Sequence, residues 1–583
     1  MTNQEVAKIF REMSLFYEME NDKFRARAYE NGAIEIEALG KDLKEVYEKG
    51  GMKALEDLPN IGRGMAEKIE EFIKIGKVKE YIALKKEMPA DLEELTAVEG
   101  LGPKGVKTLY QKLGIKNLKD LERAAKAGRI KELEGFGEKS EQNILGGIEF
   151  VKRSAGRMML GNVLPKVREL IEEFKEMKEV ISISEAGSLR RRKETIGDID
   201  ILIATEHPAQ VIQKFIGMKD IVKVWGEGPT KASVRVKGGF DPVRSTASNG
   251  VDMDLRVVPK ESWGSALQYF TGSKAHNIKL RQIAIDKGLK LNEYGLFRGK
   301  NKIAGATEEE VYRALGLDCP ESELREDTGE IEALLQAQGK LPKTIEYGSL
   351  QGDLQVQTNW TDGDNSIEEM AKAAKAAGLK YIAITDHTKS LAMTRGCDEK
   401  KLLRQMQAID DLNKKISGIK ILKGSEVDIK KDGSLDLADD VLAKLDVVGV
   451  SVHSLFKMSK KDMTARIIRA IENPNVDILF HPTGRKINKR KPYEVDMEAI
   501  IKEAVRNGTI LEINASPDRL DLKDEHIRMA VGAGAKFVID SDAHNKEGFG
   551  CLEFGIAQAR RGWAEAKDIL NTLRVVEFLD KLK

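Results

Sequence analysis

Beyond residue 350, apolar runs alternate with helix-forming segments, and each run ends at a polar residue. The six runs are "YIAITDH", "KILKGSEVD", "VVGVSVH", "DILFHP", "TILEINAS" and "FVIDSDAH". Buried parallel strands separated by helices have such near-continuous apolar sequences. When polar groups gather where the strands end, a βα-barrel with its site at the C-terminal rim is the expected fold.

A chain of 583 residues is too long for one core, and its sequence pattern changes several times. Apolar spacing of three and four predicts helices up to residue 155, and short β-branched runs from about 180 to 258 predict a mixed sheet. Residues 259–316 are expected to be mostly helical, and the charged, proline-bearing segment 317–349 to be a linker. The predicted domains are 1–88, 89–155, 156–258, 259–316 and 350–583.

Bulk composition excludes some classes of protein. The formal net charge is only +1, so any basic surface must be local. Three cysteines without a pattern indicate a reducing compartment, and the start "MTNQEVAKIF" indicates an amphipathic helix rather than a signal peptide. We expect a cytoplasmic protein with no membrane contact.

Three glycine-bearing turns each precede a helix in the N-terminal region: "LPNIGRGMAEKI", "VEGLGPKGVKTL" and "LEGFGEKSEQNI". Glycine permits tight turns, and backbone N–H groups at a helix start suit a phosphate oxygen. Such contacts hold DNA without reading its sequence. The alternative is three ordinary connections, but three copies favour DNA binding through Gly62, Gly64, Gly100, Gly102, Gly135 and Gly137.

The segment "GSLRRRKETIGDIDILI" places Asp198 and Asp200 two apart on a predicted strand, so both side chains leave one face. Asp254, in "DMDLRVV", lies on a second predicted strand and can converge on them. Carboxylates that share a face repel one another unless divalent cations lie between them, and oxygen ligands suit Mg²⁺. Two such ions can activate a 3′-hydroxyl and stabilise departing pyrophosphate. A D-x-D pair alone is more often a solvated strand edge, but the Gly187–Ser188 turn and Arg191 favour nucleotidyl transfer.

These motifs resemble family X DNA polymerases, in particular the bacterial and archaeal type with a C-terminal PHP (polymerase and histidinol phosphatase) domain. The resemblance implies a helix-hairpin-helix N-terminal region, an α+β nucleotidyltransferase palm with a helical thumb-like subdomain, and a distorted βα-barrel. It further implies a monomer that fills short gaps in base excision repair. Its substrates would be gapped or primer-template DNA and dNTPs, with Mg²⁺ or Mn²⁺ at the polymerase site.

The resemblance also assigns roles to individual residues. Asp198, Asp200 and Asp254 would bind the two metals, and Gly187, Ser188 and Arg191 the triphosphate. In "YFTGS", Tyr269, Phe270 and Gly272 would form the sugar-sensing wall, while Asn277 and Arg281 would contact the base pair and template. Two departures are Lys274, where the mammalian enzyme has an acidic residue, and a longer insert at 238–251.

A 5′-deoxyribose phosphate lyase is a further activity of the family, and it needs a lysine amine to form a Schiff base. Lys68 aligns with that nucleophile. However, Gly64 stands where a second lysine would help, and Arg27 lies near the place of an expected tyrosine. A lysine after a hairpin is also an ordinary phosphate contact, and we favour that reading over the lyase, which stays open.

In PHP domains the first metal motif reads D-x-H-x-H, but here Gln355 and Gln357 follow Asp353 in place of both histidines. An amide oxygen is a weaker ligand than imidazole. The remaining ligand positions are filled by Asp362, His387, Glu426, His453, His481, Asp542 and His544.

Two metal groupings therefore survive by analogy, Glu426 with His453 and His481, and Asp362 with His387 and His544. We favour two bound Mn²⁺ or Zn²⁺ ions and 3′–5′ exonuclease or abasic-site cleavage. The alternatives are structural metals only, or a metal-free domain. For the whole chain, the rival functions are a nucleotidyltransferase that acts on RNA or a small molecule, and a DNA-binding structural protein.

Overall fold

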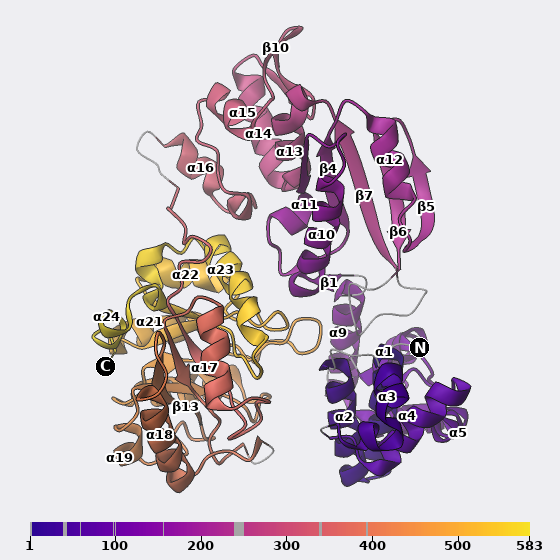
Figure 1. The fold of residues 1–583 in the computed structure, drawn as a ribbon, viewed down its shortest axis with the longest axis vertical. Coiled ribbons are helices and arrows are strands. Elements are labelled where there is room, and N and C mark those ends of the chain that lie inside the picture. Colours follow the sequence, from indigo (N-terminus) through magenta and orange to yellow (C-terminus); the bar gives the residue numbers. More distant parts are fainter. Residues whose placement is uncertain are drawn as a thin grey trace. The chain divides into compact units, whose positions relative to one another are not determined.

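The computed structural model describes residues 3–38, 43–58, 60–96, 98, 101–154, 157–237, 250–336, 341–391 and 394–582. The chain forms two compact units, one within residues 1–156 and the other from residue 157 onward (Figure 1). Among the described helices, none combines the length and apolar character that crossing a bilayer requires.

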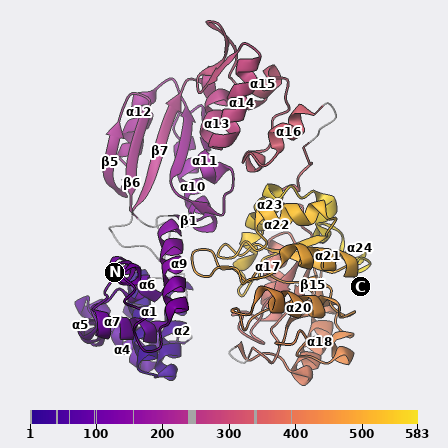
Figure 2. The ribbon, with the colours of Figure 1, turned by 180° about the vertical axis from the view of Figure 1, so that it is seen from behind.

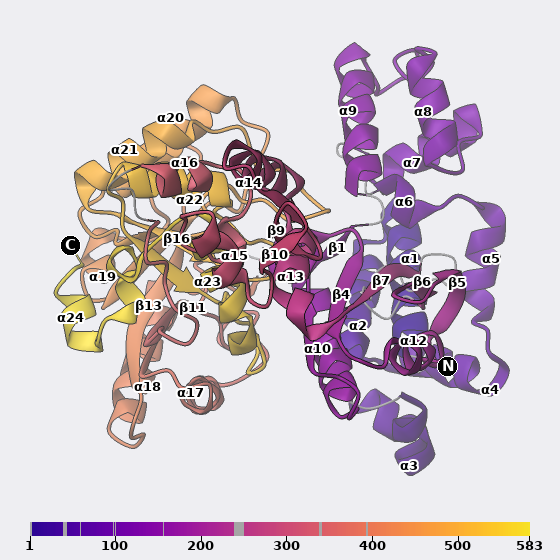
Figure 3. The same ribbon diagram turned by 90° about the horizontal axis from the view of Figure 1, so that it is seen from above.

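The first unit is helical, as predicted (Figure 3), and its described residues form two apolar cores. Gly62 and Gly102 precede α4 and α7, and Gly76 and Gly114 end these helices in the left-handed conformation that glycine favours. The helices are α1 Asn3–Met19, α2 Lys23–Ala38, α3 Leu43–Glu56, α4 Arg63–Ile75, α5 Lys79–Glu87, α6 Leu92–Thr96, α7 Pro103–Leu113, α8 Leu118–Lys126 and α9 Glu138–Ser154.

The second unit begins with a five-stranded mixed sheet of order β2-β4-β7-β6-β5. The helices α10 and α12 cover one face of this sheet and share its apolar core. Only β4 and β7 are parallel neighbours. The elements are β1 Met158–Met159, α10 Leu160–Lys175, β2 Ser182–Glu185, α11 Gly187–Arg190, β3 Thr195–Ile196, β4 Ile199–Ala204, α12 Pro208–Ile216, β5 Ile221–Glu227, β6 Lys231–Val236 and β7 Val251–Val258.

The next region was expected to be mostly helical, but it also contains a three-stranded antiparallel sheet. Each of these strands has only three or four residues, too few for the alternation that identifies a strand in sequence. The elements are η2 Lys260–Ser262, α13 Trp263–Thr271, α14 Lys274–Asp286, β8 Lys290–Asn292, β9 Gly295–Arg298, β10 Asn301–Ala304 and α15 Glu308–Ala314.

The segment 317–349, expected to be a linker, is packed over its first part. It forms η3 Ser322–Leu324 and α16 Glu330–Leu335. Arg325 is 2% exposed and pairs with the buried Glu308, while Glu330 accepts a hydrogen bond from buried His276 at 2.7 Å. Buried polar contacts, together with a few apolar residues such as Leu324 and Ile331, fix the segment, which is why the sequence pattern did not indicate a core.

The C-terminal region is a parallel sheet whose seven strands follow chain order from β11 to β17. A bridge between Val356 and Ala543 joins its two edges, so the sheet nearly closes and the predicted distorted barrel is confirmed. Helices lie on its outside (Figures 1 and 2). The elements are β11 Gly352–Val356, α17 Ile367–Ala376, β12 Tyr381–Ile384, α18 Glu399–Asn413, β13 Lys420–Asp428, α19 Asp439–Leu442, β14 Val447–Ser451, α20 Lys460–Ile471, β15 Ile478–Leu479, α21 Met497–Asn507, β16 Ile510–Asn514, α22 Asp524–Gly532, β17 Phe537–Asp540, η5 Gly548–Cys551, α23 Leu552–Arg561, η6 Ala566–Asp568, η7 Leu570–Thr572 and α24 Val575–Leu579.

The mixed sheet and the barrel are packed against each other. Ile487, Leu520 and Phe554 of the barrel belong to the apolar core of the mixed sheet. Arg168 on α10 forms a bidentate pair with Glu553 on α23, with N–O distances of 2.9 and 2.7 Å. The chain from residue 157 therefore folds as one unit rather than as two tethered domains.

Candidate active sites

Two of the three predicted palm carboxylates lie on neighbouring strands. Asp200 is on β4 and Asp254 on β7, and the two residues are direct partners in the parallel register. Asp198 lies in the bend immediately before β4, not on the strand as predicted. The strand begins one residue later because a bend at Gly197 and Asp198 follows the short β3.

Burial and repulsion disfavour the ionised form of Asp200. Burial, followed by the charges of Asp198 and Asp254, raises the pKa of Asp200 to about 7. Lys231 lies 3.4 Å from Asp254 and supplies part of the missing positive charge. Within the described residues, the three carboxylates do not bring their oxygens within 4.8 Å of one another. Repulsion of this kind is what a divalent cation relieves, so the donor set fits Mg²⁺ or Mn²⁺.

The glycine–serine turn lies directly against Asp200. Gly187 has φ of 57°, and a Cβ on it would lie 2.1 Å from the Asp200 Oδ2 atom. Only glycine therefore fits here. Ser188 follows it on the short helix α11, and Arg191 comes directly after this helix. Arg191 is close enough for its charge to lower the pKa of Asp200.

The "YFTGS" segment ends α13 beside Arg191. A Cβ on Gly272, whose φ is 71°, would lie 3.1 Å from a terminal nitrogen of Arg191. The half-buried rings of Tyr269 and Phe270 meet edge to face at 5.1 Å. Asn277 donates to the Tyr269 carbonyl at 2.7 Å and accepts from Gln268 at 2.6 Å.

The two residues that were expected to contact the base pair and template have different surroundings. Both amide atoms of Asn277 are used inside the protein, so it supports the Tyr269 backbone. Arg281 is exposed on α14, one turn further along, and donates to the Asn277 carbonyl at 3.3 Å. The insert 238–251 lies outside the described residues except for its last two positions.

The first two hairpins of the helical unit have the same backbone geometry before the helix. Gly62 and Gly102 have φ near −80° and ψ near 170°, and no side chain caps the helix that each precedes. A Cβ on Gly62, Gly64, Gly102 or Gly137 would meet nothing within 4 Å, and Gly135 has φ of 84°. The third turn thus uses the left-handed conformation, whereas Gly100 lies outside the described residues.

Lys68 is paired rather than poised as a nucleophile. Its Nζ atom lies 2.8 Å from Glu80 and 5.8 Å from the centre of the Tyr29 ring. Burial lowers the pKa of Lys68, but hydrogen bonds to Glu80 and Tyr29 outweigh it and raise that pKa above its usual value. A Schiff-base lysine needs the opposite shift.

The barrel gathers its histidines around Glu426 on β13. His481 Nε2 lies 2.8 Å and His453 Nε2 3.2 Å from one oxygen of Glu426, and His387 Nδ1 lies 3.2 Å from the other. Burial raises the pKa of Glu426, but His387 and His453 hold it well below its usual value. Burial lowers the pKa of His453, yet Glu426 and Asp428 raise it to about 9. The centre is thus built to hold positive charge.

A second group lies beside the first and shares His387. His387 Nε2 and His544 Nε2 lie 3.6 and 3.7 Å from the same oxygen of Asp362. Within the described residues, two sets bring three ligand atoms within 4.8 Å of one another: Asp362 with His387 and His544, and His387 with Glu426 and His453. His387 Nδ1 is buried 3.2 Å from Glu426 without a hydrogen bond to it, which fits a ligand of a borderline metal such as Zn²⁺ or Mn²⁺.

Amide and guanidinium groups surround the place of the first metal motif. Gln357 Nε2 donates to Glu426 at 2.9 Å, and Gln355 accepts a hydrogen bond from Asn514 at 3.0 Å. Arg519 Nε lies 3.2 Å from Asp542, which is thereby neutralised. Asp542 is therefore engaged by an arginine and is not part of either three-ligand group.

Sequence reasoning missed three residues of this site: Glu512, Asn514 and Arg519. They lie on β16 or in the loop that follows it, and their spacing matches no ligand motif. Glu512 is fully buried, and burial together with Asp540 and Asp542 raises its pKa well above the usual value. The one available signal was that "TILEINAS" carries polar groups within an apolar run.

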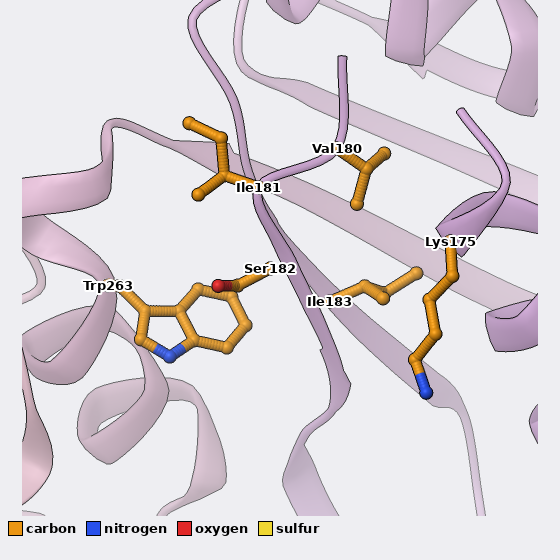
Figure 4. A pocket seen from close by; sticks show the side chains of 6 residues that line it. All are labelled: Lys175, Val180, Ile181, Ser182, Ile183 and Trp263. Atoms are coloured by element: carbon orange, nitrogen blue, oxygen red, sulfur yellow. The ribbon is translucent and has the colours of Figure 1, made fainter. Parts of the chain in front are cut away.

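A pocket of the palm lies apart from the predicted catalytic groups. It has a volume of about 450 Å³ and is lined mainly by apolar side chains (Figure 4). Trp263 closes one side, and Lys175 is its only titratable residue. The two candidate sites lie elsewhere.

Comparison with known proteins agrees with this architecture. Family models match a helix-hairpin-helix domain at residues 1–78, a SAM-like helix-hairpin-helix tandem at 92–148, the DNA polymerase beta thumb at 266–326 and a PHP domain at 353–516.

Relatives match either the whole chain or the barrel alone. A probable phosphatase of Thermoanaerobacter sp. (strain X514) is 31% identical over 231 residues, 38% of this chain and 89% of the phosphatase. The DNA polymerase/3′-5′ exonuclease PolX of Bacillus subtilis is 36% identical over 575 residues, which cover 98% of this chain and 97% of that protein. The chain belongs to the family X DNA polymerases that carry a PHP domain, the PolX type.

Proposed function

We propose that this protein is a template-directed DNA polymerase that fills short gaps during base excision repair, with a PHP domain that removes nucleotides from 3′ ends. One observation carries the first part: Asp200 and Asp254 pair in register on adjacent strands, with Gly187 of the glycine–serine turn against Asp200. It would act as a cytoplasmic monomer on gapped or primer-template DNA and dNTPs.

The palm residues divide the work at the primer end. Divalent ions, when bound, would activate the 3′-hydroxyl and neutralise the departing pyrophosphate. Asp198, Asp200 and Asp254 would hold these ions. Asp254 would also take up the proton that the primer 3′-hydroxyl loses. The Ser188 hydroxyl and the Arg191 guanidinium would hold the triphosphate, because charge-assisted hydrogen bonds to phosphate are strong.

The remaining residues would orient the substrates. Tyr269, Phe270 and Gly272 would bound the sugar of the incoming nucleotide, with Asn277 fixing the Tyr269 backbone. Arg281 would contact the template. Hairpin glycines, including Gly62 and Gly102, would let DNA phosphates approach uncapped helix starts.

In the barrel, two groups that share His387 would hold Mn²⁺ or Zn²⁺: Glu426 with His387 and His453, with His481 beside them, and Asp362 with His387 and His544. Such ions, when bound, would polarise a phosphodiester and supply hydroxide near neutral pH. Glu426 would orient the imidazoles, since it contacts three of them.

Primer extension on a one-nucleotide-gapped duplex tests the polymerase assignment. The wild type should add the complementary nucleotide, and Asp200→Asn should not. Asp286→Asn, an exposed aspartate on α14, is the matched control and should behave like the wild type. Addition that ignores the template base would instead indicate a nucleotidyltransferase with another substrate.

Release of nucleotides from a labelled 3′ end in Mn²⁺ tests the exonuclease. The wild type should release them, His453→Ala should not, and His526→Ala, a histidine on α22, should match the wild type. If all three proteins are inactive but retain metal, the barrel has a structural role.

A further inference from the structure

An arginine of the PHP domain reaches the predicted nucleotide pocket of the palm. Arg561 is the last residue of α23, and its side chain is 4% exposed. One terminal nitrogen donates to Glu326 at 3.1 Å and to the backbone carbonyl of Arg191 at 3.0 Å. The other donates to Asp524, the first residue of α22. Arg561 lies beyond the residues that match the PHP family model, which end at 516.

Glu326 is shared between this arginine and Arg191. The Arg191 Nε atom donates to Glu326 at 2.9 Å, to the same oxygen that Arg561 contacts. Lys193 lies 3.8 Å from the other oxygen. Although burial raises the pKa of Glu326, the charges of Arg561, Arg191 and Lys193 outweigh it and lower that pKa, so the carboxylate is ionised.

The sharing limits how tightly Glu326 can hold Arg191. A carboxylate with a single arginine partner forms a two-bond fork with it, which is stronger and more directional than one bond. Here Arg191 has one bond to Glu326 and one to the Thr271 carbonyl. Its guanidinium makes no other hydrogen bond to the described residues, which leaves its second terminal nitrogen for a ligand.

The position of Arg191 makes the sharing of Glu326 relevant to catalysis. Its charge acts on Asp200, and the terminal nitrogen that donates to the Thr271 carbonyl lies next to Gly272 of the "YFTGS" segment. The cluster contains three cations, Arg191, Lys193 and Arg561. They outnumber its two acids, Glu326 and Asp524. The cluster thus has an excess positive charge beside the carboxylates, as a site for a polyanion requires.

We propose that Arg561 is a positioning residue for nucleotide binding. By sharing Glu326 and binding the Arg191 carbonyl, it stops Glu326 from capturing Arg191 and keeps that guanidinium free for the triphosphate. This inference rests on the proposed role of Arg191. It makes the PHP domain a structural part of the polymerase site, independent of any cleavage by the barrel.

Steady-state extension of a gapped duplex at varied dNTP tests the proposal. Arg561→Ala should raise KM for dNTP about tenfold, the loss expected for one charge-assisted interaction, with kcat within about twofold of wild type. Adding Glu326→Gln should return KM to within about threefold of wild type, because a neutral amide cannot capture Arg191. Arg574→Ala, an exposed PHP arginine that pairs with Glu577, is the control and should change neither constant.

The outcomes separate the hypotheses. Unchanged KM in Arg561→Ala, or a raised KM that Glu326→Gln does not restore, would overturn the positioning role and leave Arg561 as a domain contact. Unchanged KM in Arg191→Ala would instead refute the nucleotide-binding role of Arg191 itself. If Arg561→Ala does not fold, Arg561→Lys takes its place. It should raise KM by a smaller factor that Glu326→Gln again reverses, while the transition-metal content of the PHP domain stays at the wild-type value.

Discussion

The two candidate sites of this protein solve opposite electrostatic problems. In the palm, Asp200 and Asp254 are register partners, and the pKa of Asp200 is raised to about 7 despite the nearby charges of Lys231 and Arg191. In the barrel, imidazoles within 3.2 Å surround Glu426, whose pKa is held low. On this account we expect the palm to take up cations together with the substrate and the barrel to keep resident ions. The oxygen ligands of the palm suit Mg²⁺, whereas the imidazoles of the barrel suit Zn²⁺ or Mn²⁺.

The largest expected effect is a cross-over between the sites. Asp254→Asn should lower gap filling at least about a thousandfold, since it removes a ligand for charge stabilisation in the transition state. It should leave the resident transition metal unchanged. Glu426→Gln should do the reverse, with loss of resident metal and normal gap filling. Metal analysis and primer extension on both variants measure this, and loss of both properties in either variant would contradict two independent sites.

The second prediction concerns the two glutamines. The double substitution Gln355→His and Gln357→His should raise resident metal from about two equivalents to about three, because imidazole is the better ligand. Metal analysis after Mn²⁺ or Zn²⁺ loading measures it. Gln407→His, an exposed position on α18, is the control and should remain at two. A double variant that also remains at two would show that Arg519 beside Asp542, rather than the glutamines, decides the number of ions.

The third prediction is a pH-dependent stability effect in the palm. The pKa of Asp200 is about 7 in the folded protein, above the ordinary carboxyl value, so the folded state holds the proton more tightly. Stability is therefore lost as pH rises toward 7 and stays lower above it. Asp200→Asn should be more stable than wild type at pH 8 in EDTA, by on the order of 4 kcal/mol at most, and the difference should shrink by pH 5.

Denaturant unfolding at the two pH values measures this difference. Asp286→Asn is again the control, and added Mg²⁺ should stabilise the wild type more than Asp200→Asn. Equal stabilities at pH 8 would mean that the palm carboxylates are not under mutual repulsion.

The smallest effect is expected at Lys68. Because Glu80 and Tyr29 raise its pKa, the amine is protonated and should not form a Schiff base. Borohydride trapping on DNA with a 5′-deoxyribose phosphate should yield no cross-link above that of Lys68→Ala. A cross-link that depends on Lys68 would establish the lyase.

Much of the fold followed from local patterns. Six long apolar runs predicted the barrel, and helical spacing predicted the first unit. The three strands from Lys290 to Ala304 were missed because they are too short to show alternation. The packed part of 317–349 was missed because Arg325 is buried through an ion pair and Glu330 through a hydrogen bond with His276, and such contacts leave no apolar pattern.

The sites were predictable to a different degree. The histidine groups in the barrel could be expected because each ligand follows a strand that ends at the same rim. The partners of Gln355 and Asp542 could not, since Asn514 and Arg519 come from a loop whose path depends on tertiary packing. The contact from Arg561 to Arg191 spans 370 residues and has no local signal at all.

The most direct test of the central contrast is anomalous diffraction from Mn²⁺-soaked crystals, collected with and without gapped DNA and a non-hydrolysable dNTP. Ions should appear among Asp198, Asp200 and Asp254 only when nucleotide is bound, and beside Glu426 and Asp362 in both states. Nucleotide-bound crystals without an ion at the three palm carboxylates would contradict the account.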